Sequence, residues 1–138
     1  MSRTPVILLV EDNPANRLLT TALLEREGYE VDLAGTSDEV LERLHARRPD
    51  LILMDIQLPG HDGLYVTRQL KADPATQDIP VVALTAHAMA GDREQALAVG
   101  CAGYLSKPID TRMFGAQIRE FLGIDAAPSR ADRREETG

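Results

Sequence analysis

Short runs of apolar residues recur through this 138-residue sequence, with longer amphipathic stretches between them. Residues 6–10, 51–54 and 81–84 are continuous apolar runs. Runs of this length, bounded by Pro, Asp and Gly, are typical of strands buried on both faces, as in a parallel sheet covered by helices. Residues 29–33 alternate between polar and apolar types, which predicts an edge strand. A short apolar piece at Tyr104–Leu105 is the fifth expected strand.

The stretches between these strands carry signals for helices. Asn13 and Pro14 suit a helix start, because Asn13 can cap free amide groups and Pro14 needs no donor at the first helical position. Gly28 is suited to end this helix. Thr36 and Glu39 have the spacing of a capping box, which opens a second helix. The expected helices cover residues 14–28, 36–44, 63–71, 91–99 and 110–122.

Strand and helix signals therefore alternate five times along the chain. Strict alternation predicts right-handed crossovers and a doubly wound parallel sheet with helices on both faces. Five strands with an edge-like second strand favour the flavodoxin-like α/β fold, in the strand order 2-1-3-4-5. We expect one domain over residues 1–123. Residues 124–138 are rich in Ala, Arg and Glu without an apolar period, and we predict a disordered tail there.

The composition restricts the kinds of partner and the cellular compartment that can be expected. The formal net charge of -7 argues against a nucleic-acid partner, because a polyanion repels an acidic domain. No apolar run approaches the length of about 18 residues that spans a membrane. Cys101 is the single cysteine, so no internal disulfide can form, which fits a reducing compartment. These features predict a cytoplasmic protein without a membrane partner.

Three carboxylates follow two of the buried strands. Glu11 and Asp12 come directly after the first strand, and Asp55 comes directly after the third. In the expected strand order these strands are neighbours, and their carboxyl ends border the crevice where such folds bind ligands. A divalent cation would relieve the repulsion among the carboxylates, and an all-oxygen site suits Mg²⁺. The sequence therefore predicts a Mg²⁺ site formed by Glu11, Asp12 and Asp55.

A hydroxyl and an ammonium group are expected at the same edge of the sheet. Thr85 follows the fourth strand and Lys107 follows the fifth. Beside Mg²⁺ and a carboxylate, these groups form a receptacle for a phosphoryl group. The metal ion and Lys107 would neutralise its oxygens, Thr85 would donate to one of them, and Asp55 would attack in line.

Taken together, these motifs resemble the CheY-like receiver domain of bacterial two-component response regulators. The resemblance covers about residues 5–122. Residues 80–92 and 100–109 are especially similar to single-domain cell-cycle regulators and to the receivers of hybrid kinases. The motifs that carry it are Glu11-Asp12, Asp55 within 51–60, Thr85-Ala86 and Lys107-Pro108.

The resemblance implies a role for each matching residue. Asp55 would accept a phosphoryl group from a histidine kinase or a histidine phosphotransfer protein. Asp12 would bind Mg²⁺ directly, Glu11 would bind it through water, and the main-chain carbonyl of Gln57 would be a further ligand. Lys107 would form a salt bridge with the phosphoryl group.

The remaining expected roles concern the switch and its output. The resemblance implies that Thr85 and Tyr104 form the switch pair. Gln57 and His87, each two residues beyond a site residue, would flank the path of the hydrolytic water and tune the lifetime of the phosphorylated form. The face formed by the fourth helix, the fifth strand and the fifth helix is the expected output surface.

Three other functions are consistent with parts of this pattern. A phosphatase of the haloacid-dehalogenase type also uses an Asp nucleophile and Mg²⁺, but it needs an acid where this chain has Gln57. A flavin carrier would need a phosphate loop rich in Ser, Thr and Gly where Glu11 and Asp12 stand. A receiver-like adaptor that is never phosphorylated is the third. We expect no enzyme beyond self-phosphorylation and dephosphorylation, and a monomer or weak dimer that signals through protein contacts.

Overall fold

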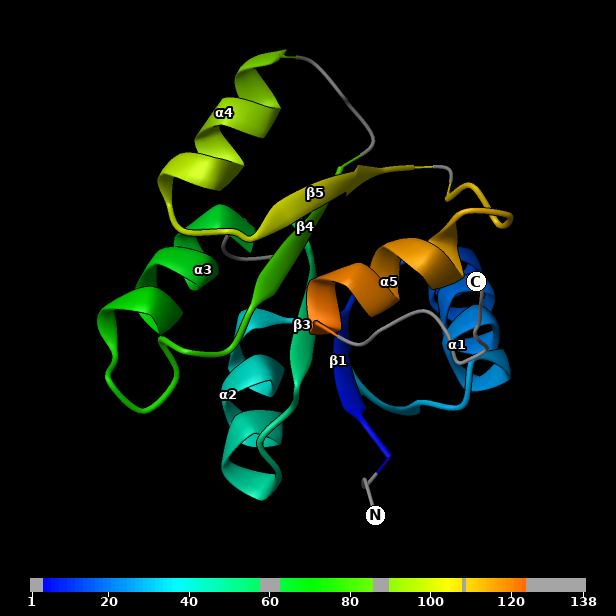
Figure 1. Cartoon of the computed structure of the whole chain (residues 1–138). Coiled ribbons are helices and arrows are strands. Elements are labelled where there is room, and N and C mark those ends of the chain that lie inside the picture. Colours follow the sequence, from blue (N-terminus) through cyan, green and yellow to red (C-terminus); the bar gives the residue numbers. More distant parts are fainter. Residues whose placement is uncertain (1–3, 58–62, 86–89, 108, 124–138) are drawn as a thin grey trace.

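A parallel β-sheet forms the middle layer of the protein, with helices on both faces (Figure 1). The computed structural model describes residues 4–57, 63–85, 90–107 and 109–123. The strands are β1 (Val6–Val10), β2 (Glu30–Ala34), β3 (Leu51–Asp55), β4 (Val81–Thr85) and β5 (Gly103–Ser106). The helices are α1 (Pro14–Arg26), α2 (Ser37–Ala46), α3 (Gly63–Ala72), α4 (Ala90–Ala98) and α5 (Phe114–Leu122).

The strand order is β2-β1-β3-β4-β5, and all neighbouring strands are parallel. This confirms the flavodoxin-like order and the place of the second strand at an edge. The central strands β1, β3 and β4 are buried along their whole length, as their continuous apolar sequences require. Within the described ranges, no helix is both long and apolar enough to cross a lipid bilayer.

The expected start signals of α1 and α2 are both used, with one difference in detail in α2. The Asn13 side chain accepts a hydrogen bond from the Asn16 amide at 3.0 Å, and Pro14 is the first helical residue of α1. In α2 the Glu39 amide donates to the Thr36 hydroxyl at 3.2 Å. Glu39 then reaches one residue further back than a capping box predicts, because its carboxylate accepts from the Gly35 amide at 2.6 Å.

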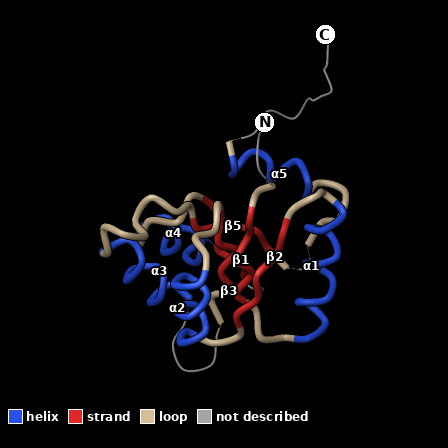
Figure 2. The backbone as a smooth tube through the Cα atoms, turned by 90° about the horizontal axis from the view of Figure 1, so that it is seen from below, coloured by secondary structure: helices blue, strands red, loops and turns tan. Residues whose placement is uncertain are grey.

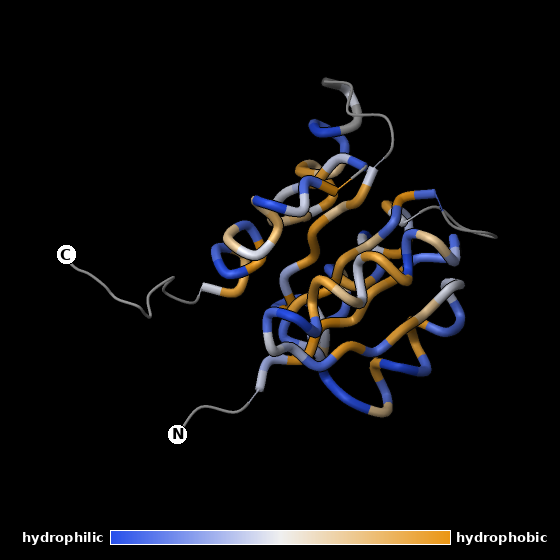
Figure 3. The backbone as a smooth tube through the Cα atoms, turned by 90° about the vertical axis from the view of Figure 1, so that its right-hand side faces the viewer, coloured by the Kyte–Doolittle hydropathy of each residue, from blue (hydrophilic) through white to orange (hydrophobic). Residues whose placement is uncertain are grey.

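Two apolar layers fill the space between the sheet and the helices. Side chains at alternate strand positions pack against α2, α3 and α4 on one face, and against α1 and α5 on the other. Figure 2 shows the two helical layers on either side of the strands. Figure 3 shows that the apolar segments concentrate in the interior. Each strand therefore sends successive side chains to opposite helical layers.

The last helix begins later than the sequence suggested. Residues 110–113 form a turn, in which the Arg112 amide donates to the Asp110 carboxylate at 3.0 Å and the Phe114 amide donates to the Asp110 carbonyl at 3.0 Å. The short side chain of Asp110 supports this local turn, so α5 starts only at Phe114.

Candidate functional site

Main-chain hydrogen bonds hold the segments that leave β1, β3 and β5 at the carboxyl edge of the sheet. The Glu11 amide donates to the Ala34 carbonyl at 2.9 Å. The Ile56 amide donates to the carbonyl of Leu84 at 3.1 Å, and the Lys107 amide donates to that of Thr85 at 2.8 Å. The ladder thus extends one residue past each of these strands, and it fixes the backbone of Glu11 and Lys107 next to Asp55.

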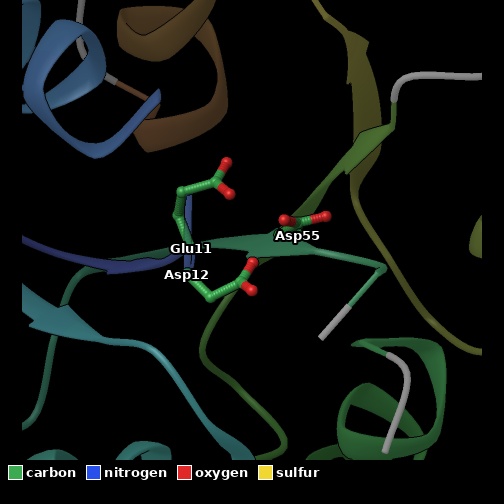
Figure 4. A group of neighbouring side chains, drawn as sticks. All are labelled: Glu11, Asp12 and Asp55. Atoms are coloured by element: carbon green, nitrogen blue, oxygen red, sulfur yellow. The ribbon is translucent and has the colours of Figure 1, made fainter. Parts of the chain in front are cut away.

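The three predicted carboxylates lie together at this edge (Figure 4). Glu11, Asp12 and Asp55 each place one carboxylate oxygen within 4.8 Å of the other two. Glu11 is 1% exposed and Asp55 is 3% exposed, whereas Asp12 is exposed to solvent. Two carboxylates are therefore shielded from water, and the third borders the solvent.

Lys107 lies between the two buried carboxylates. Its Nζ is 2.8 Å from Glu11 Oε1 and 3.1 Å from Asp55 Oδ2. The Lys107 ammonium is thus the charged partner of both buried carboxylates. Glu11 Oε2 accepts a hydrogen bond from the Asn13 amide at 3.1 Å.

This arrangement shifts the protonation equilibria of Glu11 and Lys107. Burial raises the pKa of Glu11, and the neighbouring Asp55 raises it further. Burial alone would lower the pKa of Lys107, but its contacts with Glu11 and Asp55 together raise that pKa above its ordinary value. The lysine is therefore a permanent cation that compensates part of the carboxylate charge.

The donor set fits a hard divalent cation. Three carboxylates face one lysine, so negative charge remains in excess at the cluster. Asp12 is open to solvent, so a cation bound there could keep several waters. An all-oxygen, partly hydrated site of this kind is the coordination that Mg²⁺ prefers.

Asp55 is held in place by its own loop and by the start of α3. Its Oδ1 accepts a hydrogen bond from the Gln57 amide at 2.9 Å, while the Gln57 side chain is exposed. Gly63 packs directly against this backbone: a Cβ there would collide with the Asp55 carbonyl and approach the Ile56 Cα to 2.8 Å. No signal near Gly63 in the sequence indicates this role, because only the tertiary contact shows why a side chain is excluded.

Thr85 and Tyr104 belong to the opposite face of the sheet. In β4 and β5, Ala83 pairs with Tyr104 and both pack in the layer under α3 and α4. By strand alternation Thr85 points to this same layer, whereas Asp55 points toward α1 and α5. Arg93 of α4 lies over the Tyr104 ring, with its guanidinium carbon 5.6 Å from the ring centre.

The structure thus brings Glu11, Asp12, Asp55 and Lys107 into one cluster, with Thr85 at the same edge of the sheet. Thr85 is buried, at 2% exposure. His87 lies outside the described residues, so its expected part in tuning lifetime stays a prediction. Arg93 was not singled out from the sequence, and its place on α4 gave no separate signal for its contact with Tyr104.

Comparisons with known proteins agree with this geometry. Residues 7–119 match the family model described as the response regulator receiver domain. The chain is 46% identical over 117 residues to the polar-differentiation response regulator DivK of Brucella anthropi, a match that covers 85% of this chain and 95% of that protein.

Two solved structures are also similar. The receiver domain of a sensor histidine kinase from Pseudomonas aeruginosa, with a magnesium ion coordinated in its active-site cleft, is 37% identical, with a TM-score of 0.79 over 88% of this chain and 99% of that chain. The phosphorylated cyanobacterial phytochrome response regulator RcpA is 30% identical, with a TM-score of 0.77 over 87% and 94%. From the family match and the identity to DivK, the chain belongs to the response regulator receiver domain family.

Proposed function

We propose that this protein is a single-domain response regulator that accepts a phosphoryl group on Asp55 with the aid of Mg²⁺. The observation that carries the proposal is the cluster of Glu11, Asp12 and Asp55 around the Lys107 ammonium. The magnesium ion in the related kinase receiver and the phosphorylated state of RcpA support the same chemistry here. The expected cytoplasmic location and the expected tail at 124–138 remain predictions.

The protein's own groups have distinct parts in this reaction. Asp12 and Asp55 would hold the ion directly, Glu11 through water, and the Gln57 carbonyl would complete the protein ligands. When bound, Mg²⁺ neutralises charge on the phosphoryl oxygens. An Asp55 oxygen attacks the phosphorus in line, and the bond to the leaving group of the donor breaks as the new oxygen–phosphorus bond forms. Because Asp55 and Glu11 are held rigidly before the reaction, little reorganisation is needed.

Lys107 changes its partners in the course of the reaction. In this structure it compensates Glu11 and Asp55. Once the phosphoryl group is attached, the Lys107 ammonium pairs with one of its oxygens, and the Thr85 hydroxyl donates to another. Phosphorylation adds a charge of about -1.5 to -2 at this edge, so both groups gain interactions that the unmodified protein lacks.

The signal is proposed to leave through the face formed by α4, β5 and α5. Thr85 and Tyr104 share one layer of the sheet, so movement of Thr85 toward the phosphoryl group changes the packing around the Tyr104 ring. Arg93 joins that ring to α4, and the exposed Leu97 of the same helix offers an apolar contact for a partner. Nuclear magnetic resonance of the Tyr104 ring tests this step: an unchanged ring environment on phosphorylation contradicts it.

The phosphodonor is proposed to be a histidine kinase or a histidine phosphotransfer protein that docks on α1. Leu18 is 75% exposed and Leu19 is 41% exposed on this helix, which begins two residues after Asp12. Exposed leucines beside the site give an apolar surface on which a donor protein can position its phosphohistidine.

Incubation with acetyl phosphate, followed by intact-mass measurement, tests the proposal. We expect a labile gain of one phosphoryl group that requires Mg²⁺ and is lost in Asp55→Asn. Asp50→Asn is the matched control: Asp50 adjoins the other end of β3, where its carboxylate accepts from the Val6 amide at 2.8 Å. That variant should be labelled like the wild type. Labelling that survives Asp55→Asn refutes the assignment, and absence of labelling in the wild type favours the phosphorylation-independent adaptor.

A further inference from the structure

An apolar groove between α2 and α3 has no part in the proposed phosphotransfer. Two adjoining hollows of about 360 and 170 Å³ form it, and both are lined by Leu41, Gln69 and Leu70. Leu41 is 52% exposed on α2, and Tyr65 is 39% exposed on α3. In Figure 1 these two helices lie side by side, on the opposite face of the sheet from α1.

The groove has an apolar middle and charged ends. Its larger hollow is lined by Leu44 and Ile79 as well as Leu41. Asp38 lines the end at the start of α2, and His45 and Arg48 line the end where α2 stops. Along α2 the rim of the groove is therefore acidic at one end and basic at the other, with an exposed leucine between them, while Asp73 lines the larger hollow from the side of α3.

This charge pattern is complementary to the same pattern on a second copy of the chain in the antiparallel orientation. We propose that the occupant of the groove is a second copy of this chain, bound through antiparallel α2 helices related by a two-fold axis. Asp38 of one copy then faces Arg48 of the other, and this pairing occurs twice. Leu41 of each copy enters the groove of its partner, which is the isologous arrangement that a two-fold dimer requires.

The spacing along α2 suits this pairing. Asp38, Leu41 and His45 are separated by three and four residues, so they lie along one side of the helix. Arg48 lies two residues after the end of the helix, and its Nη1 donates to the Ala75 carbonyl at 2.7 Å. That hydrogen bond holds the guanidinium beside the groove and leaves its other N–H groups available for a carboxylate.

The proposal does not depend on phosphorylation. None of the residues that line the groove belongs to α1 or to the carboxylate cluster, so a dimer formed through the groove would use neither of them. Because exposed ion pairs contribute little and the apolar surface is small, the dimer is expected to be weak.

Sedimentation equilibrium of the unmodified protein, over a concentration series without Mg²⁺, tests the inference. We expect a reversible monomer–dimer equilibrium in the wild type. Asp38→Arg and Arg48→Asp should each weaken self-association about tenfold or more, because each places like charges opposite one another twice. Leu41→Lys should weaken it at least as much.

The decisive arm is an equimolar mixture of the Asp38→Arg and Arg48→Asp proteins. In that mixed dimer every position 38 faces an opposite charge at position 48, so association should return to about the wild-type strength. Recovery also shows that neither variant fails through misfolding. Glu94→Arg on α4, also an exposed charge reversal, should leave self-association unchanged.

Four results would overturn the inference. A wild type that stays monomeric at all concentrations removes the proposed occupant. Self-association that persists in Leu41→Lys, or that is lost in Glu94→Arg, places the interface elsewhere. A mixture of the two charge-reversed proteins that does not associate contradicts the antiparallel pairing.

Discussion

Replacement of Lys107 by methionine is expected to destabilise the Mg²⁺-free protein more than the Mg²⁺-bound protein. The lysine lies 2.8 Å from Glu11 Oε1 and 3.1 Å from Asp55 Oδ2, and its side chain is only 15% exposed. Lys107→Met keeps most of the apolar stem but leaves two buried carboxylates without their cation. A bound Mg²⁺ ion can supply that missing charge, whereas buffer with a chelator cannot.

The magnitude follows from these distances. A unit charge pair about 3 Å apart, at an effective dielectric constant of about 20, attracts by about 5 kcal/mol before desolvation is subtracted. Removal of one member of a close buried pair has a net cost of about 2–5 kcal/mol, and partial exposure favours the lower end of that range. We therefore expect a loss of about 2 kcal/mol without Mg²⁺, and less than about half of that when Mg²⁺ is saturating.

Urea unfolding of both proteins, with chelator and with Mg²⁺, measures this difference. For a slope of about 2 kcal/mol per molar urea, the midpoint of the metal-free variant should fall by about 1 M. Lys71→Met is the matched control, because Lys71 Nζ donates to the Gln77 carbonyl at 3.0 Å and the Ile79 carbonyl at 2.7 Å, away from the cluster. The Lys71→Met protein should lose the same free energy of unfolding in both buffers. An equal loss for Lys107→Met in both buffers would refute the reasoning.

Three further predictions follow from single side chains. Gly63→Ala should lower stability by about 1–3 kcal/mol in urea unfolding, because the added methyl meets main chain, including the Ile56 Cα at 2.8 Å, that cannot move aside; an unchanged midpoint contradicts this. Burial raises the pKa of the Cys101 thiol, so native protein should react slowly with a thiol reagent even at mildly alkaline pH and rapidly in urea; equal rates would disprove it. Arg47→Ala should leave the urea midpoint nearly unchanged at high salt, because the ion pairs of Arg47 with two acidic side chains of β2 are exposed and are screened by salt. A large drop in the midpoint at high salt argues against this.

The fold could be predicted because several local signals agreed. The apolar runs at β1, β3 and β4 permitted only strands buried on both faces, and Asn13 and Gly28 delimited α1 by local backbone chemistry, with Gly28 at a φ of 94°. The strand order then followed from the alternation of strands and helices. These signals depend on residues that are close in sequence, so the chain itself carries them.

The details that could not be predicted from the sequence depend on contacts between residues that are far apart along the chain. Nothing near Lys107 in the sequence indicates that its ammonium pairs with Glu11 before any phosphoryl group is present. The salt bridge between Glu27 and Arg119, at 2.8 Å, joins residues 92 positions apart. The late start of α5 likewise reflects a competition between the Asp110 turn and the helix, which apolar periodicity does not resolve.

Asp55 and Thr85 point to opposite faces of the sheet, and this affects how a change on one face can reach the other. Five strands with tightly packed apolar side chains separate the helical layer of α1 and α5 from the layer that contains Tyr104. We expect coupling between the two sides to pass through the carboxyl ends of the strands, where Asp55 and Thr85 lie at the same edge of the sheet. Substitutions in the middle of the strands should therefore change the free energy of unfolding. Substitutions at the carboxyl ends of the strands should instead change the coupling between the two faces of the sheet.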